Sequence, residues 1–143
     1  MVKRGVVVDT NVIVSGILGQ SYSRKIIDAW LRSEIEVVIS DELKQEVNEV
    51  FKRPYVTKGL RESSKGSLRR TLGTLFNNAI IVVPKRLNII GFPDEDDNFL
   101  LEIAISANAI AIVTGDKALL KLKKVHKVEL LSPMQFCNTF NIK

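Results

Sequence analysis

Two segments far apart in the sequence each end an apolar run on an aspartate. The run at residues 6–8 precedes Asp9, and the run at residues 111–115 precedes Asp116. A short β-branched run without polar alternation is typical of a strand buried on both faces, as in a parallel sheet. Ligands of such sheets bind outside the carboxyl ends of the strands. The two aspartates therefore indicate one shared site, and carboxylates gathered there are suited to holding a divalent cation.

Two further acids are placed by helical spacing. Glu46 has Leu43 three residues before it and Val50 four residues after it, which predicts a position at the edge of a buried helical stripe. Asp97 lies in the first turn of another predicted helix, where an acid also complements the helix dipole. In the acidic run around it, Asp96 is expected to cap the helix while Asp97 points inward.

The elements that position these acids alternate along the chain. Strands are predicted at residues 6–8, 36–39, 109–113 and 128–131, with a strand or an extended entry to a proline at 80–83. Helices are predicted from Ser21 or Ser23 to residue 31, at 41–51, within the stretch around 68–76, at 97–107, and after Ser132. This alternation predicts βαβ units with right-handed crossovers and therefore an α/β fold with a mainly parallel sheet.

Length and composition fit one ordinary domain. The 143 residues are enough to bury a sizeable core, so we expect a single domain over residues 1–143. No apolar run approaches the roughly 20 residues that span a bilayer, and the first residues lack the apolar region of a signal peptide. Cys137 is the only cysteine, which excludes an intrachain disulfide and fits a reducing compartment. We expect a cytoplasmic protein without membrane contact.

The charge distribution favours a polyanionic partner. The net charge is +5 and the isoelectric point is near 9.4. A segment that we name the basic stretch contains Lys52, Arg53, Lys58, Arg61, Lys65, Arg69 and Arg70. A second set, the lysine group, contains Lys117, Lys121, Lys123, Lys124 and Lys127. Either set alone could be a solubilising surface, but acids that hold a cation beside bases that hold phosphates are the layout of a nuclease.

Four segments in chain order carry a resemblance to a known family. They are residues 8–11, 40–54, 96–100 and 113–120. Together they resemble the successive motifs of PIN domains, and the resemblance covers essentially the whole chain. The Arg53-Pro54 pair and the Asp-Asp-Asn sequence at 96–98 are similar to the branch described as toxin components of toxin–antitoxin pairs.

The resemblance implies a three-layer α/β/α sandwich and metal-dependent cleavage of RNA. By matching motif, the acidic quartet comprises Asp9, Glu46, Asp97 and Asp116, and the supporting polar groups include Asn11 and Thr114. Ligands that are all oxygen favour Mg²⁺ or Mn²⁺, which would activate water and neutralise transition-state charge. We expect Asp9 and Asp116 to bind the metal directly; which acid accepts the water's proton stays open. RNA, an antitoxin protein and a second copy of the chain, in a homodimer or higher oligomer, are the expected partners.

Other functions stay open. A housekeeping RNA-processing nuclease would need the same residues as a toxin. A non-catalytic RNA-binding or regulatory PIN module usually lacks the carboxylates, whereas this chain keeps all four. A haloacid-dehalogenase-like phosphatase would need a second aspartate where Asn11 stands, and no glycine-rich phosphate loop is present.

Overall fold

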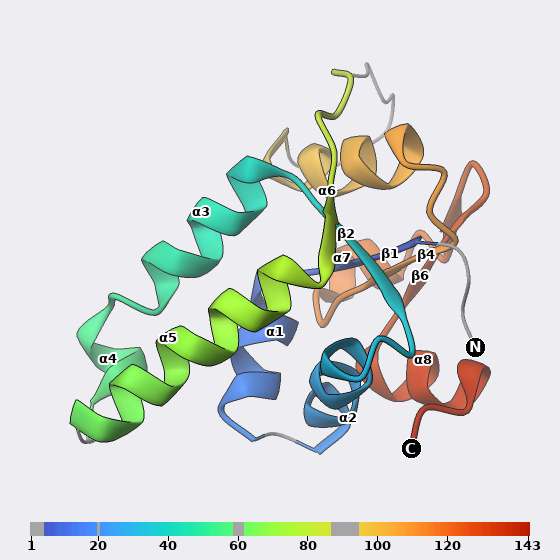
Figure 1. The fold of residues 1–143 in the computed structure, drawn as a ribbon. Helices are drawn as coiled ribbons and strands as arrows, with labels where there is room; N and C mark the ends of the chain where they lie inside the picture. Colours follow the sequence, from blue (N-terminus) through green and yellow to red (C-terminus); the bar gives the residue numbers. More distant parts are fainter. Residues whose placement is uncertain (1–4, 20, 59–61, 87–94) are drawn as a thin grey trace.

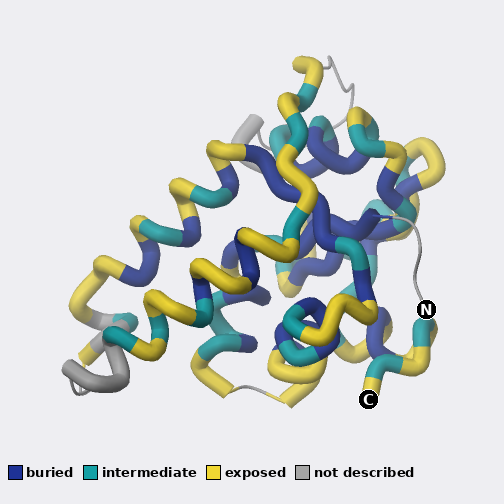
Figure 2. Tube along the Cα trace, viewed as in Figure 1, coloured by how far each residue is buried: buried dark blue, intermediate teal, exposed yellow. Residues whose placement is uncertain are grey.

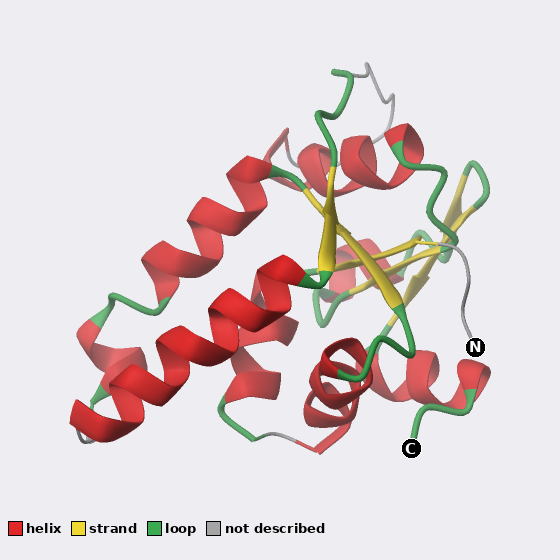
Figure 3. Cartoon of the chain, in the orientation of Figure 1, coloured by secondary structure: helices red, strands yellow, loops and turns green. Residues whose placement is uncertain are grey.

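A computed structural model of the chain describes residues 5–19, 21–58, 62–86 and 95–143, with the side chains at 55, 57, 62–65 and 95–98 outside the description. Six strands form one sheet of order β3-β2-β1-β4-β6-β5 (Figure 3). They are β1 (Gly5–Val8), β2 (Glu36–Ile39), β3 (Ala79–Ile81), β4 (Ala111–Val113), β5 (Lys124–Val125) and β6 (Val128–Leu131). All paired neighbours are parallel except β5 and β6. The mainly parallel sheet is therefore confirmed.

Helices cover both faces of this sheet. They are α1 (Thr10–Ile17), α2 (Ser21–Leu31), α3 (Asp41–Val50), α4 (Pro54–Thr57), α5 (Glu62–Asn77), α6 (Glu95–Ser106), α7 (Lys117–Leu120) and α8 (Pro133–Phe140). On one face α6 packs against β1, β2 and β4, and on the other α2 and α8 lie side by side (Figure 1). This arrangement confirms the three-layer sandwich. Within the described ranges, no helix is long and apolar enough to cross a membrane.

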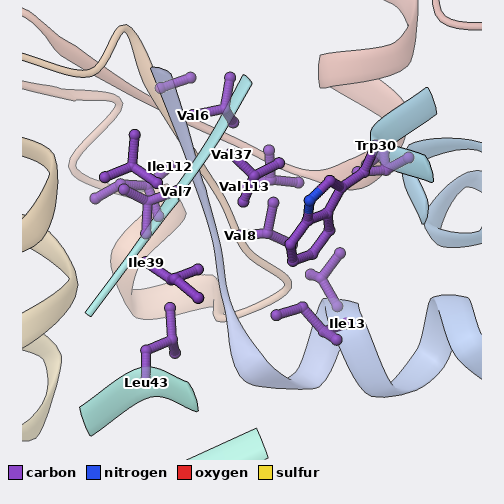
Figure 4. Packing of buried hydrophobic residues seen from close by; sticks show 14 of the residues in the cluster. Val6, Val7, Val8, Ile13, Trp30, Val37, Ile39, Leu43, Ile112 and Val113 are labelled. Carbon is purple, nitrogen blue, oxygen red and sulfur yellow. The ribbon is translucent and has the colours of Figure 1, made fainter. Parts of the chain in front are cut away.

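The core forms around the central strands. Every residue of β1 and β4 is buried, as the unbroken apolar runs predict. Trp30, the only tryptophan, is fully buried, and its indole lies against Val8 and Ile13 (Figure 4). The fluorescence of this one residue therefore reports on the packing of α1 and α2 against the central sheet.

Three helices leave the sheet as a projection that we name the helical arm, consisting of α3, α4 and α5 (Figure 1). Its outward faces are exposed, whereas its inward stripes are buried (Figure 2). The Nζ atom of Lys44 on α3 lies 5.4 Å from the ring centroid of Phe76 on α5. The buried residues of α3 and α5 belong to the same hydrophobic core as the central strands, and the outward faces of the arm lie in solvent.

Local signals set most element boundaries, with one notable exception. Ser40 caps α3 by accepting from the amide of Leu43 at 3.1 Å, and Ser132 forms a capping box with Gln135 on α8. The sequence did not predict α1, whose β-branched residues at 12–14 resemble a continued strand. Burial of its Val12 and Ile13 face in the core outweighs that weak local propensity.

Candidate functional site

Asp9 and Asp116 follow β1 and β4, where the strand order reverses. From β1 the sheet extends through β2 to β3 on one side and through β4 to β6 on the other. The backbone amide of Asp9 donates to the carbonyl of Val113 at 2.9 Å and joins the two strand ends. In open α/β sheets, the crevice outside the carboxyl ends at such a reversal is the usual ligand site. The topology therefore favours this edge as the functional site.

The side chain of Thr114 connects Asp9 to the neighbouring strand. Thr114 is fully buried, and its hydroxyl donates to Oδ2 of Asp9 at 2.7 Å. The same hydroxyl oxygen accepts from the backbone amide of Asp116 at 3.1 Å. Because one hydroxyl binds both groups, the position of the Asp9 carboxylate is coupled to the turn that carries Asp116.

Asp116 has a structural task beside its position in the site. Its Oδ1 atom accepts from the backbone amide of Ala118 at 2.8 Å and caps α7. The sequence analysis missed this short helix, although an aspartate ahead of good helix formers is a typical helix start. Capping uses one carboxylate oxygen and leaves Oδ2 for another ligand.

Burial makes the Asp9 carboxylate costly to ionise in the protein alone. It raises the pKa of Asp9 above the usual value, and the negative charge of Asp116 raises this pKa further. Hydrogen bonds from Thr114 and from the backbone amides of Thr10 and Asn11 lower the pKa without cancelling the rise. A divalent cation would offset the cost, and carboxylate oxygens are the ligands that Mg²⁺ and Mn²⁺ prefer. The donor set is therefore chemically suited to such a cation.

Comparison with known proteins agrees with this chemistry. A PIN-domain profile matches residues 5–118, which include both aspartates. The chain belongs to the PIN-domain family. The uncharacterized protein MJ1680 of Methanocaldococcus jannaschii is 29% identical over 127 residues, which cover 88% of this chain and 79% of that protein. PIN domains are in general nucleases that commonly use divalent metal ions, so membership supports a nuclease acting on nucleic acid.

Glu46 of this PIN domain lies on the helical arm. It is exposed, as are Glu42 and Glu49, so the expectation that Glu46 turns away from water while the other two face it is wrong. Because the arm projects from the body, α3 buries only a narrow stripe, and a residue beside that stripe stays in solvent. α3 packs along α1, the helix that begins directly after Asp9. Glu46 therefore belongs to an element next to the site, and its place in the quartet stays a prediction.

The acidic run lies in the first turn of α6. This helix begins at Glu95, two residues earlier than predicted, so the expectation that Asp96 precedes the helix as its cap is wrong. Acids in a first turn are stabilised by the helix dipole, which explains the early start. Because α6 leads back to the start of β4, its first turn lies toward the edge where β4 ends.

The predicted inward orientation of Asp97 lies outside the described part of the chain, which does not include the side chains of Asp96 and Asp97. Among the side chains that are described, no group of three or more aspartate, glutamate, histidine or cysteine residues is arranged to hold a metal. Two members of the predicted quartet, Asp9 and Asp116, are thus brought together, and the other two stay predictions.

Among the remaining predicted residues, those that the structure describes are exposed to solvent. Asn11 is exposed in the first turn of α1, directly after Asp9. The exposed members of the basic stretch are Lys52, Arg53, Lys58, Arg69 and Arg70, whereas Arg61 and the side chain of Lys65 lie outside the described residues. Every member of the lysine group is exposed. The acids of α3 share the arm with these cations, so the arm carries both signs of charge.

Proposed function

We propose that this PIN-domain protein is a divalent-metal-dependent endoribonuclease with Asp9, Glu46, Asp97 and Asp116 as its acidic quartet. The observation that carries the proposal is the Asp9 carboxylate, which is half-buried, bound by Thr114 and next to the charge of Asp116. A carboxylate that a fold buries and fixes at an energetic cost is typical of a functional site. Mg²⁺ or Mn²⁺ is the proposed cation.

The roles within the site follow from its chemistry. Asp9 and Asp116 are the proposed direct ligands, and Glu46 and Asp97 complete the shell directly or through water. When bound, the cation lowers the pKa of water and neutralises charge on the phosphodiester transition state. Thr114 holds one oxygen of Asp9, so the carboxylate need not reorient during the reaction.

The substrate is held by charge and by polar groups beside the acids. We assign contacts with RNA phosphates to the basic stretch as a whole, because the cations of this stretch that the structure describes are exposed on the arm. Asn11 is the supporting polar group beside Asp9, and Thr114 supports Asp9 from within the sheet. Such phosphate contacts position an RNA without selecting its sequence.

We further propose that the nuclease acts as the toxin of a toxin–antitoxin pair. Its partner would be an antitoxin protein, and the toxin itself would form a homodimer or higher oligomer. The support for this role is the resemblance of Arg53-Pro54 and the Asp-Asp-Asn sequence at 96–98 to that branch. Expression of the protein alone should arrest growth, and co-expression of the protein encoded beside it should restore growth. Unchanged growth with active protein would favour a housekeeping RNA-processing nuclease instead.

The nuclease proposal is tested with purified protein and labelled single-stranded RNA. Cleavage should require Mg²⁺ or Mn²⁺, stop with EDTA, and resume when the metal is returned. A parallel reaction with single-stranded DNA of the same sequence separates ribonuclease from general nuclease activity. Full cleavage in excess chelator would rule out the metal mechanism.

A further inference from the structure

A hollow of about 300 Å³ lies between the first turns of α2 and α8. It is lined by Ser21, Tyr22, Ser23, Ser132, Pro133 and Met134. Ser132 directly follows β6, and the carbonyl of the preceding Leu131 accepts from the amide of Thr114 at 2.9 Å. The hollow is therefore one strand beyond Thr114 and two strands beyond Asp9, at the same edge of the sheet.

Hydroxyl groups at this hollow have unused capacity to donate. Ser23 is only 8% exposed, and its hydroxyl makes no hydrogen bond within the part of the chain that the structure describes. The Ser132 hydroxyl accepts from the amide of Gln135 at 3.1 Å, which leaves its own proton to donate. Because Ser23 is mostly buried but lines the hollow, its hydroxyl can donate to an acceptor that binds there.

The electrostatics of the hollow favour an anion. A helix N-terminus carries partial positive charge, and neither α2 nor α8 has an acid in its first turn to compensate it. Lys25 adds a full charge nearby, since its Nζ lies 5.1 Å from the ring centroid of Tyr22. Asp28, further along α2, is paired with Arg24 at 3.1 Å, so its negative charge is compensated. Two helix N-termini and a lysine together form a favourable environment for a phosphate.

We propose that this hollow binds a backbone phosphate of the RNA strand that continues from the Asp9 site. The inference rests on the proposed function and adds a second point of contact to it. Ser132 also lines a neighbouring hollow of about 360 Å³ that includes Lys123, so a strand passing over Ser132 meets a cation there as well. The exposed ring of Tyr22 offers a surface on which a base can stack. The PIN-domain profile ends at residue 118, so the α8 half of this hollow lies outside the matched segment.

A single added charge tests the proposal without harming the fold. Ser21→Asp places an acid in the first turn of α2, where it favours the helix, so the melting temperature should be unchanged or higher. The acid should repel phosphate. Affinity for a fluorescein-labelled single-stranded RNA, measured by anisotropy in EDTA to prevent cleavage, should fall about tenfold because the added carboxylate repels the phosphate.

Two further variants separate the site from a general charge effect. Ser23→Ala removes the hydroxyl that lines the hollow without adding charge and should also weaken RNA binding. Asn138→Asp adds the same charge at an exposed position of α8 away from its first turn and should bind RNA as the wild type does. Inorganic phosphate, titrated into ¹⁵N-labelled protein, should shift the amide signals of Ser21, Ser23 and Met134.

The outcomes distinguish this site from the nuclease proposal. Wild-type RNA affinity in both Ser21→Asp and Ser23→Ala would overturn the phosphate subsite while leaving RNA cleavage at Asp9 intact. Amide shifts with free phosphate but unchanged RNA affinity would mean a site for a free anion, which also overturns the RNA contact. If the wild-type protein binds no RNA, the subsite and the proposed function fail together.

Discussion

The strand ends and the helical arm both carry predicted functional residues, but the fold holds them very differently. At the strand ends, Asp9, Thr114 and Asp116 are joined by hydrogen bonds of 2.7 and 3.1 Å and follow wholly buried strands. On the arm, Arg69 and Arg70 of α5 are exposed, and the outward faces of the arm lie in solvent (Figure 2). Groups that act on reacting atoms must be fixed, whereas contacts with phosphates depend mainly on charge. Under the proposed function, the strand ends would carry most of the chemistry and the exposed cations of the arm would contact RNA.

The largest expected effect is on cleavage rate. Asp9→Asn and Asp116→Asn should each lower the rate at saturating RNA by about 10² or more, because electrostatic groups at reacting centres are typically worth that much. Arg70→Gln, on the arm, should cleave saturating RNA at nearly the wild-type rate and lose affinity instead. Two results would contradict the contrast between the two regions: wild-type cleavage rates in both aspartate variants, or a loss of cleavage rate in Arg70→Gln as large as theirs.

The second-largest effect is on stability. It compares the packing of α1, the helix that directly follows Asp9, with the packing of α5 on the arm. A Cβ at Gly16 of α1 would lie 2.6 Å from the carbonyl oxygen of Ser23 and would overlap the side chain of Ile27. Gly16→Ala should therefore destabilise the protein by about 1–3 kcal/mol. Gly73 of α5 is exposed with nothing within 4 Å of its Cβ position, so Gly73→Ala should stabilise the helix by about 0.5–1 kcal/mol. Denaturant unfolding followed by Trp30 fluorescence measures both, and equal tolerance at the two glycines would contradict the contrast.

Local chemistry explains which features could be predicted from sequence. Buried strands at 36–39 and 128–131, and helix caps at Ser40 and Ser132, follow from propensity and hydrogen bonding within a few residues. The meeting of Asp9 and Asp116 followed from parallel-strand geometry. The exposure of Glu46 could not be predicted from the sequence, because a helical wheel cannot show that α3 projects from the body. The helix α1 could not be predicted from local sequence either, because it depends on burial against residues distant in sequence.

A third prediction concerns the salt dependence of RNA binding. If the basic stretch neutralises phosphates, affinity should fall with salt at a log–log slope of about −0.7 for each phosphate on a single strand. Charge reversal of Arg69 and Arg70 to glutamate should weaken binding and make that slope shallower. The matched control reverses Lys121 and Lys124, and a larger effect there would move the RNA surface to the lysine group beside Asp116.

The smallest effect is the dependence of stability on pH without metal. A carboxyl group with a pKa higher in the folded than in the unfolded state takes up a proton on folding, so its ionisation destabilises the protein as pH rises through the folded pKa. Because burial raises the pKa of Asp9, Asp9→Asn should melt at a higher temperature than the wild type at neutral pH in EDTA. This difference should disappear below the usual value of 3.8, where Asp9 is protonated in both states. A less stable Asn variant at neutral pH would contradict the cost assigned to the carboxylate.

The central claim, that the strand-end aspartates hold a divalent cation, is tested most directly by binding of Mn²⁺ to the protein without RNA. Saturating Mn²⁺ should raise the melting temperature of the wild type by linkage. Asp9→Asn and Asp116→Asn should lose this rise, Asp97→Asn should reduce it, and Glu42→Gln on the exposed face of α3 should keep it in full. A full metal-induced rise in Asp9→Asn, or none in the wild type, would show that Asp9 is not a metal ligand and would contradict the account.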